Sequence, residues 1–474
     1  MTTTGPLVVV GDLLLDQDVT GDATRLAPDA PVPVVDVADE RSRPGGAGLA
    51  AMLAARHHSD VVLVAAVGAD EASAVARRAL RDRVCLVPIP LEGTLPVKTR
   101  VFAGGHPLVR IDRGGGVPGR ADARALAALA GAGTILVADY GRGTAESLRP
   151  ALAAAAGRVS VAWDPHPKGG PPVPGTRLAT PNAAEAHGPD GRGASLRAHA
   201  ERGAELAARW GAGCVAVTLG ERGALLTRPG GTAPVLVPAP YRAEGDPCGA
   251  GDCFSAAVAA ALAAGALPEE AVERAVAEAA AFVRAGGAGN RELWEVTPPT
   301  GPVAGPVAGP SSGEEPAPGD AFELARRVHA RGGTVVATGG CFDLLHAGHV
   351  GLLENAGRIG DCLIVCVNSD TSLARLKGPG RPLNQLADRM RVLSALGSVD
   401  AVVSFDEDTP VRLLESLRPD VWVKGGDYAA DDLPEARVLR SWGGQAVALP
   451  YLDGLSTTSL AHRAARTVPD REAV

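Results

Sequence analysis

The sequence predicts an α/β protein built from two parallel-sheet domains, the first of which carries a small β lid. Short runs rich in Val, Leu and Ala alternate with Ala-rich helical stretches, which is typical of a parallel sheet covered by helices on both faces. Most of these runs end in Gly or Asp, and α/β folds bind ligands at the carboxyl ends of their strands. A segment rich in Pro, Gly and Ala at residues 297–320 separates the two parts and is predicted to be a linker.

The overall composition argues against a general nucleic-acid-binding protein. The 474 residues carry a formal net charge of −8, and the pI is near 5.7, whereas a nucleic-acid binder normally presents a basic face. Hydrophobic residues make up 46% of the chain but aromatic residues only 3%, so Ala, Val and Leu must fill the cores. We therefore expect local basic pockets for phosphates and no nucleic-acid partner.

The cysteines and the N-terminus point to a cytoplasmic protein. None of the seven cysteines has CxxC spacing, which makes a zinc site improbable, and several lie in apolar runs as expected for buried thiols. The first residues, MTTTGPLVVVGD, lack the basic and long apolar regions of a signal peptide. No apolar run approaches the roughly 20 residues that span a bilayer, so we expect no membrane association.

The first predicted domain comprises residues 1–296. Five apolar runs are predicted as its main strands: LVVVGD, VVLVAAVG, TILVADYG, VSVAWDP and CVAVTLG. A second set alternates more polar residues and is predicted to form a small sheet over the ligand site: VPVVDVA, VKTRVFA and PLVRIDR.

The second predicted domain comprises residues 321–474. Its predicted strands are TVVATGG, CLIVCVNSD, DAVVSF, DVWVKGGD and AVALPY. Helical segments such as NQLADRMRVLSAL separate them. This order predicts a compact, Rossmann-like parallel sheet.

The most informative motif of the first domain is DPCGAGDCFSAAVAAALAAG at residues 246–265. Gly249, Ala250 and Gly251 open a long apolar helix, where backbone N–H groups and the helix dipole favour an anion. The carboxylate of Asp252 lies beside that anion site and could accept a proton from an attacking hydroxyl. An aspartate that merely caps the helix is an equally good interpretation of this stretch alone.

Other polar groups follow the predicted strands and favour the binding interpretation. Gly45 and Gly46 enter a helix, Asn182 and Glu185 follow a strand, and Asp12 and Asp16 lie near the end of the first strand, where they suit sugar hydroxyls. The segment VTLGERGALL adds Thr218, Gly220 and Gly223 in a tight strand–turn–strand.

These residues resemble the ribokinase-like (PfkB-type) carbohydrate kinases over residues 5–295, and within them the heptose-7-phosphate kinases. The matching segments are VVGDLLLDQDVTG, LVRIDRG, VADYGRG, DPHPKG and TPNAAEA, in the expected order. The resemblance implies that Asp252 is the general base, that residues 249–251 hold the transferring phosphoryl group, and that Asn182 and Glu185 act at the ATP phosphates with Mg²⁺. It places residues 218–223 near the nucleotide and Asp12, Asp16, Gly45 and Gly46 at the sugar. The family usually has Asn where this chain has Leu49, which leaves the identity of the sugar open.

The most informative motif of the second domain is GCFDLLHAGHVGLL at residues 340–353. His346 and His349 are three residues apart and so share one face of a first helical turn. The spacing differs from the His-Glu-x-x-His of zinc proteases, and two adjacent core imidazoles are seldom buried without partners. Phosphate binding fits better, because imidazoles at a helix N-terminus can donate to a pyrophosphate leaving group.

The HxGH pattern resembles that of the nucleotidyltransferase superfamily, and residues 334–465 resemble its cytidylyltransferase-like domains, especially the heptose-1-phosphate adenylyltransferases. The resemblance implies that the two histidines and the hydroxyls of Ser456, Thr457 and Thr458 contact the nucleotide phosphates, and that Lys377 neutralises charge. Phe342, Asp343 and Arg389 complete the implied nucleotide site, and Lys424 and Asp427 lie in a further matching segment. Gly340 stands where the adenylyltransferases usually carry Asn, which leaves the nucleotide open.

Together the two resemblances imply a bifunctional enzyme that makes ADP-heptose. The first domain would phosphorylate C1 of heptose 7-phosphate with ATP, and the second would join heptose 1-phosphate to AMP after a separate phosphatase has acted. Two rivals remain open, namely the same pair of reactions with another sugar or with CTP, and a non-catalytic sugar-phosphate sensor. The small sheet is a possible homodimer surface.

Overall fold

The computed structural model describes residues 5–188, 191, 194–230, 234–243, 245–295, 320–378, 380–425 and 434–449. These residues form two compact units. The first unit draws on residues 1–194, 202–221 and 242–300, and the second on 195–201, 222–241 and 301–474. The predicted linker lies outside the described residues except for Asp320, so its bounds remain a prediction.

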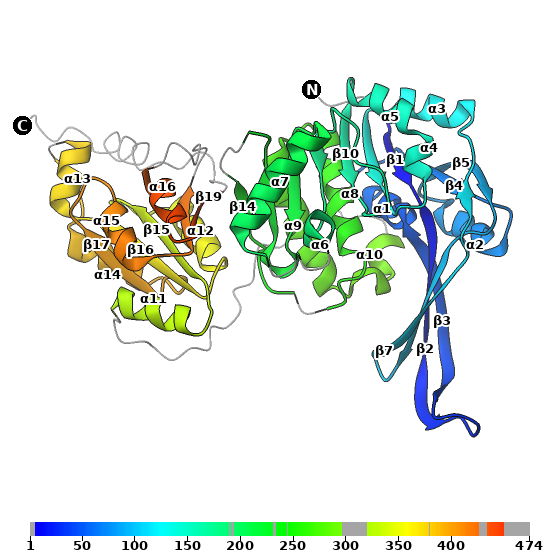
Figure 1. The fold of residues 1–474 in the computed structure, drawn as a ribbon, viewed down its shortest axis with the longest axis horizontal. Helices are drawn as coiled ribbons and strands as arrows, with labels where there is room; N and C mark the ends of the chain where they lie inside the picture. Colours follow the sequence, from blue (N-terminus) through cyan, green and yellow to red (C-terminus); the bar gives the residue numbers. More distant parts are fainter. Residues whose placement is uncertain are drawn as a thin grey trace, which may run out of the picture. The chain divides into compact units, whose positions relative to one another are not determined.

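The first unit contains the expected parallel sheet (Figure 1). Its strands lie in the order β12 (Cys214–Thr218), β11 (Leu178–Ala179), β10 (Ser160–Asp164), β9 (Thr134–Ala138), β1 (Leu7–Gly11), β4 (Val61–Val67), β5 (Cys85–Glu92) and β8 (Val117–Pro118). All neighbours pair in parallel except β5 and β8. β1 and β9 are buried at every position because helices cover both faces. The five predicted main strands are confirmed.

Ala-rich helices flank this sheet. Helices α1 and α8 pack on β1, β4, β9 and β10, while α3 packs on β4 and β5. The helices and 3₁₀ turns of residues 47–295 are α1 (Ala47–Ala54), α2 (Glu71–Leu80), α3 (Ala123–Ala130), α4 (Thr144–Ser147), α5 (Arg149–Ala156), α6 (Ala183–His187), α7 (Leu196–Trp210), η2 (Gly220–Arg222), α8 (Ala250–Ala263), α9 (Pro268–Arg284), η3 (Gly287–Gly289) and α10 (Glu292–Glu295). The small side chains on α1 and α8 allow close approach, and every residue of α1 is buried.

The predicted lid is a four-stranded sheet in the order β3 (Pro33–Gly46), β2 (Leu13–Leu26), β6 (Val97–Ala103) and β7 (His106–Arg113). Much of β2, β3 and β7 projects away from the body of the unit (Figure 1). β2 was not predicted as a strand. It pairs antiparallel with β3 and parallel with β6, and its first four residues are buried while its far end is exposed. Polar alternation therefore identified three of the four lid strands.

The second unit contains a parallel sheet in the order β17 (Ala401–Phe405), β16 (Cys362–Asn368), β15 (Val335–Gly340), β18 (Val421–Gly425) and β19 (Gln445–Leu449). These are the five strands predicted for the C-terminal domain, and they are confirmed. Its helices are α11 (Ala321–Ala330), α12 (Ala347–Gly357), α13 (Asp370–Lys377), α14 (Leu386–Ser394), α15 (Val411–Leu417) and α16 (Pro434–Arg440). A hairpin of β13 (Ala224–Thr227) and β14 (Val235–Val237) also falls with this unit.

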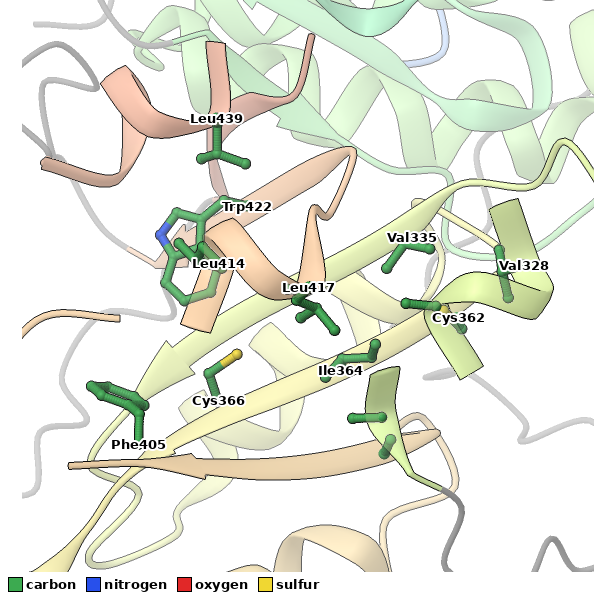
Figure 2. Close-up of a cluster of buried hydrophobic side chains, with 14 of the residues drawn as sticks. Val328, Val335, Cys362, Ile364, Cys366, Phe405, Leu414, Leu417, Trp422 and Leu439 are labelled. Atoms are coloured by element: carbon green, nitrogen blue, oxygen red, sulfur yellow. The ribbon is translucent and has the colours of Figure 1, made fainter. Parts of the chain in front are cut away.

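The core of the second unit shows why few aromatic residues suffice. Alternate residues of β15, β16 and β18 point to one face of the sheet, where helices α11, α15 and α16 cover them (Figure 2). Trp422 is fully buried there with Leu414, Leu439 and Cys366. Trp422 and Phe405 supply the large rings of this cluster, and aliphatic side chains and two thiols fill the rest of it. None of the described helices combines the length and apolar character that a bilayer-spanning segment needs.

Candidate active sites of the two units

The site of the first unit begins where α8 starts. Gly249 is the N-cap residue and has a φ of 79°, in the left-handed region that favours glycine. A Cβ atom at this position would lie 2.9 Å from Cδ2 of Leu49 and 3.1 Å from Cβ of Ala288. Both the backbone conformation and the close packing therefore require glycine. Leu49, which packs close to this glycine, is fully buried on α1, so an apolar side chain lies at this point of the site.

Asp252 lies in the first turn of α8, and only 7% of its surface is exposed. The phenol of Tyr140 donates a hydrogen bond of 2.5 Å to its Oδ1. Burial raises the pKa of Asp252 to about 7, with a smaller contribution from nearby Asp16, while Tyr140 and Lys98 oppose the rise. A carboxylate that titrates near neutral pH is well suited to accept a proton from a hydroxyl.

The predicted sugar-binding residues lie close to this carboxylate but differ in how they are held. Asp12 accepts three backbone hydrogen bonds, from the N–H groups of Tyr140, Arg142 and Thr144 at 2.9–3.1 Å. Its carboxylate thus organises the loop after β9. Asp16 is buried against Gly45, where a Cβ atom would lie 2.8 Å from the carboxylate.

A buried arginine lies beside Asp16 at the base of the lid. Arg43 is 4% exposed, donates to Asp18 and lies 3.8 Å from Oδ2 of Asp16. These carboxylates raise the pKa of Arg43 despite its burial. Sequence reasoning did not single out Arg43, although this residue directly precedes the Pro44-Gly45-Gly46 motif that was predicted to enter a helix.

The residues predicted for the nucleotide meet at the ends of β11 and β12. Asn182 and Glu185 form a reciprocal capping box. The backbone N–H of Asn182 donates to the side chain of Glu185 at 2.7 Å, and the backbone N–H of Glu185 donates to the side chain of Asn182 at 3.0 Å. Asn182 also forms a β-bridge with Thr218. Gly220 and Gly223 both have positive φ, and a Cβ atom at Gly223 would lie 2.0 Å from the carbonyl oxygen of Val237. The Asn-x-x-Glu spacing therefore has a structural role, and its role at the nucleotide stays a prediction.

Sequence reasoning missed three side chains of this unit: Tyr140 and Asp164, which lie near Asp252, and Asp139, which lies near Asp12. Asp164 ends β10, and burial raises its pKa well above the ordinary value, with further contributions from Glu185 and Asp252. Burial also raises the pKa of Asp139 to about 6. Each follows or ends a predicted strand, so the rule that ligands bind at carboxyl ends could have singled them out.

The carboxylates of Asp164 and Glu185 suit a hard cation only together with another ligand. Among the described residues, no group of three or more His, Cys, Asp or Glu side chains has the geometry to hold a metal ion. Burial nevertheless raises the pKa of both Asp164 and Glu185, and repulsion from Glu185 adds to the rise at Asp164; a nearby cation would favour the charged form of both carboxylates. Mg²⁺ commonly uses one or two carboxylates together with phosphates and water, and this donor set fits that habit.

The site of the second unit lies between β15 and α12. His346 is the N-cap residue of α12, and the centroids of the His346 and His349 rings are 3.9 Å apart. Both ring nitrogens of His346 and Nδ1 of His349 are buried and have no hydrogen-bond partner among the described residues. Burial lowers the pKa of His349 to about 4, with smaller contributions from His346 and Lys377, so this imidazole is neutral at pH 7.

The loop between β15 and α12 is held in an uncommon conformation. Phe342 has a φ of 47°, which is rare for a bulky residue, and its buried ring lies 5.4 Å from that of His349. Asp343 accepts hydrogen bonds from Arg381 and from the backbone N–H groups of Leu383 and Asn384 at 2.7–3.0 Å. These bonds lower the pKa of Asp343 although burial opposes the shift. Asp343 therefore ties the loop to residues 381–384.

Arg389, predicted at the nucleotide, is buried on α14 and bonded to protein groups. Its guanidinium donates to the carbonyl oxygens of Asn384 and Cys341 and to the carboxylate of Asp370, at 2.7–3.0 Å. These three contacts hold together the loops around the histidines. The geometry supports positioning of the site, and a direct nucleotide contact stays a prediction.

Replacement of Arg389 with Met is expected to lower the free energy of unfolding of the second domain by about 2–4 kcal/mol, because three partly buried hydrogen bonds that join separate loops are lost. Thermal denaturation measures the effect, with the loss of adenylyltransferase activity as the signal that this domain has unfolded. Arg391→Met is the matched control, since Arg391 is exposed on the same helix. Equal melting temperatures for the two variants would contradict the structural role of Arg389.

The lysines of this unit differ in their surroundings. Lys377 is exposed at the end of α13, near enough to lower the pKa of His349. Lys424 lies 3.9 Å from Glu435 and over the Trp422 ring. The predicted residues Asp427, Ser456, Thr457 and Thr458 lie outside the described residues.

Comparison with known proteins agrees with both halves of this description. Residues 151–295 match the pfkB family of carbohydrate kinases, and residues 337–463 match the cytidylyltransferase-like family. A bifunctional protein HldE of Streptomyces coelicolor is 59% identical over 464 residues, which cover 97% of this chain and 96% of that protein. The bifunctional protein HldE of Azotobacter vinelandii is 41% identical over 472 residues and 97% of each chain.

Among solved structures, a ribokinase from Arabidopsis thaliana in complex with ribose and ATP is similar to this chain. The two are 22% identical with a TM-score of 0.48, and the match covers 59% of this chain and 93% of the ribokinase. The family matches confirm a ribokinase-like domain with a lid followed by a Rossmann-like nucleotidyltransferase domain.

Proposed function

The chain belongs to the family of bifunctional HldE proteins, and on that premise we propose how its residues divide the two reactions. It is a carbohydrate kinase joined to a nucleotidyltransferase. The kinase phosphorylates C1 of heptose 7-phosphate, and the second domain transfers an adenylyl group to heptose 1-phosphate to form ADP-heptose.

In the kinase reaction we assign the general base to Asp252. Its supporting observation is a buried carboxylate with a pKa near 7, directly after the glycine turn that opens α8. The C1 hydroxyl gives its proton to Asp252 as its oxygen attacks the γ-phosphorus of ATP, the bond from that phosphorus to the bridging oxygen breaks, and ADP leaves. The backbone N–H groups of Gly249 and Gly251 would face the charge that develops on the phosphoryl oxygens, whereas that of Ala250 donates to the carbonyl oxygen of Pro247. Asp16 and Gly45 hold the sugar beside this turn.

The nucleotide of the kinase binds near the ends of β11 and β12 in this proposal. Asn182 and Glu185, fixed to each other by their capping box, would hold Mg²⁺ through its water and phosphate ligands, with Asp164 nearby. When bound, Mg²⁺ neutralises charge on the β- and γ-phosphates. Thr218 and Gly220 line the nucleotide side.

In the adenylyl transfer we assign phosphate binding to His346 and His349. Its supporting observation is the set of three buried ring nitrogens at the N-terminus of α12 that have no partner within the described part of the chain. Neutral imidazoles can each donate one N–H to the phosphates, and the backbone N–H groups of the helix add to this anion site. A phosphate oxygen of heptose 1-phosphate then attacks the α-phosphorus, and pyrophosphate leaves toward the histidines and Lys377.

A coupled assay tests the whole function. The purified chain is incubated with heptose 7-phosphate, ATP, Mg²⁺ and a 7-phosphatase, and the products are identified by mass spectrometry. ADP-heptose is the expected product. Heptose bisphosphate alone would contradict the adenylyl transfer, and no phosphorylated product would contradict the kinase. Parallel reactions with CTP, and with other sugar phosphates, test the two substrates that Gly340 and Leu49 left open.

A further inference from the structure

The hydroxyl of Tyr140 makes the one hydrogen bond to the Asp252 carboxylate that the described residues provide. The donor–acceptor distance is 2.5 Å and the accepting atom is Oδ1. Burial beside Asp252 raises the pKa of Tyr140 well above its ordinary value, so the phenol stays protonated and remains a donor at neutral pH. The bond thus engages one oxygen of the carboxylate and leaves Oδ2 for another proton donor.

The backbone of Tyr140 is itself held in place. Its N–H donates to Oδ2 of Asp12 at 3.1 Å, and Arg142 and Thr144 bond the same carboxylate. Asp12 directly follows β1, whose five residues are buried in the middle of the sheet. The carboxylate of Asp12 therefore ties the backbone of Tyr140 to the end of a buried central strand.

Two side chains lie near the ring of Tyr140. Nζ of Lys98, from lid strand β6, lies 5.3 Å from the ring centroid, and the ring of His166 stacks at a centroid distance of 6.5 Å. A cation over a phenol ring attracts it electrostatically. The lid and the core thus both contribute to the orientation of this side chain.

We propose that Tyr140 is a positioning residue of the kinase reaction, which holds Asp252 through Oδ1 so that Oδ2 faces the acceptor hydroxyl. The inference rests on the proposed role of Asp252 as the general base. The phenol keeps its own proton throughout: the proton of the C1 hydroxyl moves to Oδ2, and the O–H of Tyr140 remains a donor to Oδ1. Because a phenol donor favours the charged carboxylate, the same bond also sets the pH at which the base becomes active.

Tyr140→Phe removes only the hydroxyl and keeps the ring with its neighbours Lys98 and His166. Without the donor, the ionised form of Asp252 is less favoured, so the acidic limb of the kinase kcat/KM profile should move up by about one pH unit. Loss of orientation should lower kcat by about tenfold to a hundredfold. KM for ATP should stay within a factor of two of the unmodified enzyme. A pH limb that does not move overturns the proposal, whatever happens to the rate.

A second variant tests the opposite direction without loss of the hydrogen bond. A fluorinated tyrosine at position 140 is nearly the same size but a stronger donor, so it should lower the pH of the limb. A rise or no movement overturns the proposal. The adenylyltransferase activity of the same molecules reports whether they are folded, because that reaction uses the other domain.

Failure of this inference is distinguishable from failure of the base assignment. Asp252→Asn is assayed beside the tyrosine variants. If Asp252→Asn keeps near-native kinase turnover, the base assignment is wrong. If Asp252→Asn is inactive and Tyr140→Phe retains both the native rate and the native pH limb, Asp252 stands and the role of Tyr140 is wrong.

Discussion

Replacement of Asp252 with Asn is expected to reduce the kinase kcat by about 10²–10⁴-fold, which is the usual contribution of a positioned general base. An amide cannot take the proton of the acceptor hydroxyl, yet it keeps the size of the carboxylate and an oxygen that can accept the hydrogen bond from Tyr140. ATP binding should change little because this carboxylate is assigned to the acceptor side. Kinase turnover and ATP affinity, measured on the full chain, check the two parts separately.

Two controls belong to this experiment. Glu273→Gln makes the same carboxylate-to-amide change at an exposed position on α9 and should leave the kinase rate unchanged. The adenylyltransferase rate of Asp252→Asn should equal that of the unmodified chain. Near-native kinase turnover in Asp252→Asn would contradict the assignment.

The pKa of Asp252 also predicts a pH profile and a stability effect. Because burial raises its pKa to about 7, kinase kcat/KM should rise with pH through about 7 as the base ionises. Between the ordinary pKa near 3.8 and this value the folded state holds a proton that the unfolded chain has lost, so stability falls as the pH rises across that range. Asp252→Asn removes this dependence. Its melting temperature relative to the unmodified chain should therefore increase from pH 5 to pH 8.

Replacement of His346 or His349 with Asn is expected to lower the adenylyltransferase kcat/KM by about 10²–10³-fold each, the usual cost of one donor aimed at transition-state charge. The two rings lie 3.9 Å apart and serve the same phosphates, so the double variant should lose less than the product of the two single effects. Steady-state release of pyrophosphate measures each rate. Kinase activity of the same variants is the control for folding.

The state of ionisation of the histidine pair gives a further test of this assignment. Burial lowers the pKa of His349 to about 4 and also lowers the pKa of His346 below its ordinary value, so both imidazoles are mostly neutral in the free enzyme at pH 7. The kcat/KM profile for adenylyl transfer should thus show no limb from His349 between pH 6 and pH 8. A limb near pH 6.5 that disappears in His349→Asn would contradict neutral donors.

Much of the fold could be predicted because its signals are local. Apolar runs such as those of β1 and β16 are buried on both faces in the structure, and a run of this kind can hardly be anything other than a central parallel strand. β2 escaped prediction because it passes from a buried start to an exposed end. Its alternation therefore changes along its length, and pairing with β3 and β6 decides its structure.

The site residues, too, could be predicted only where their signal lies within a short motif. Asp252 and the pair His346 and His349 were predicted, because a glycine turn before a helix and an HxGH spacing are short sequence patterns with a direct chemical meaning. Tyr140 and Asp164 were missed. Each lies far along the chain from Asp252, and only the parallel order of β1, β9 and β10 brings the loops that follow them to one edge.

The sequence by itself therefore determined the two domain types, the strands and the residues whose chemistry is carried within a single motif. The tertiary structure decided what those residues do among their neighbours: Asp12 binds the loop that holds Tyr140, Arg389 binds the loops that hold the histidines, and burial moves the pKa of Asp252 to about 7. The physical reason is that hydrogen-bond partners and desolvation depend on groups distant in the chain, whereas a helix turn or a strand depends on adjacent ones.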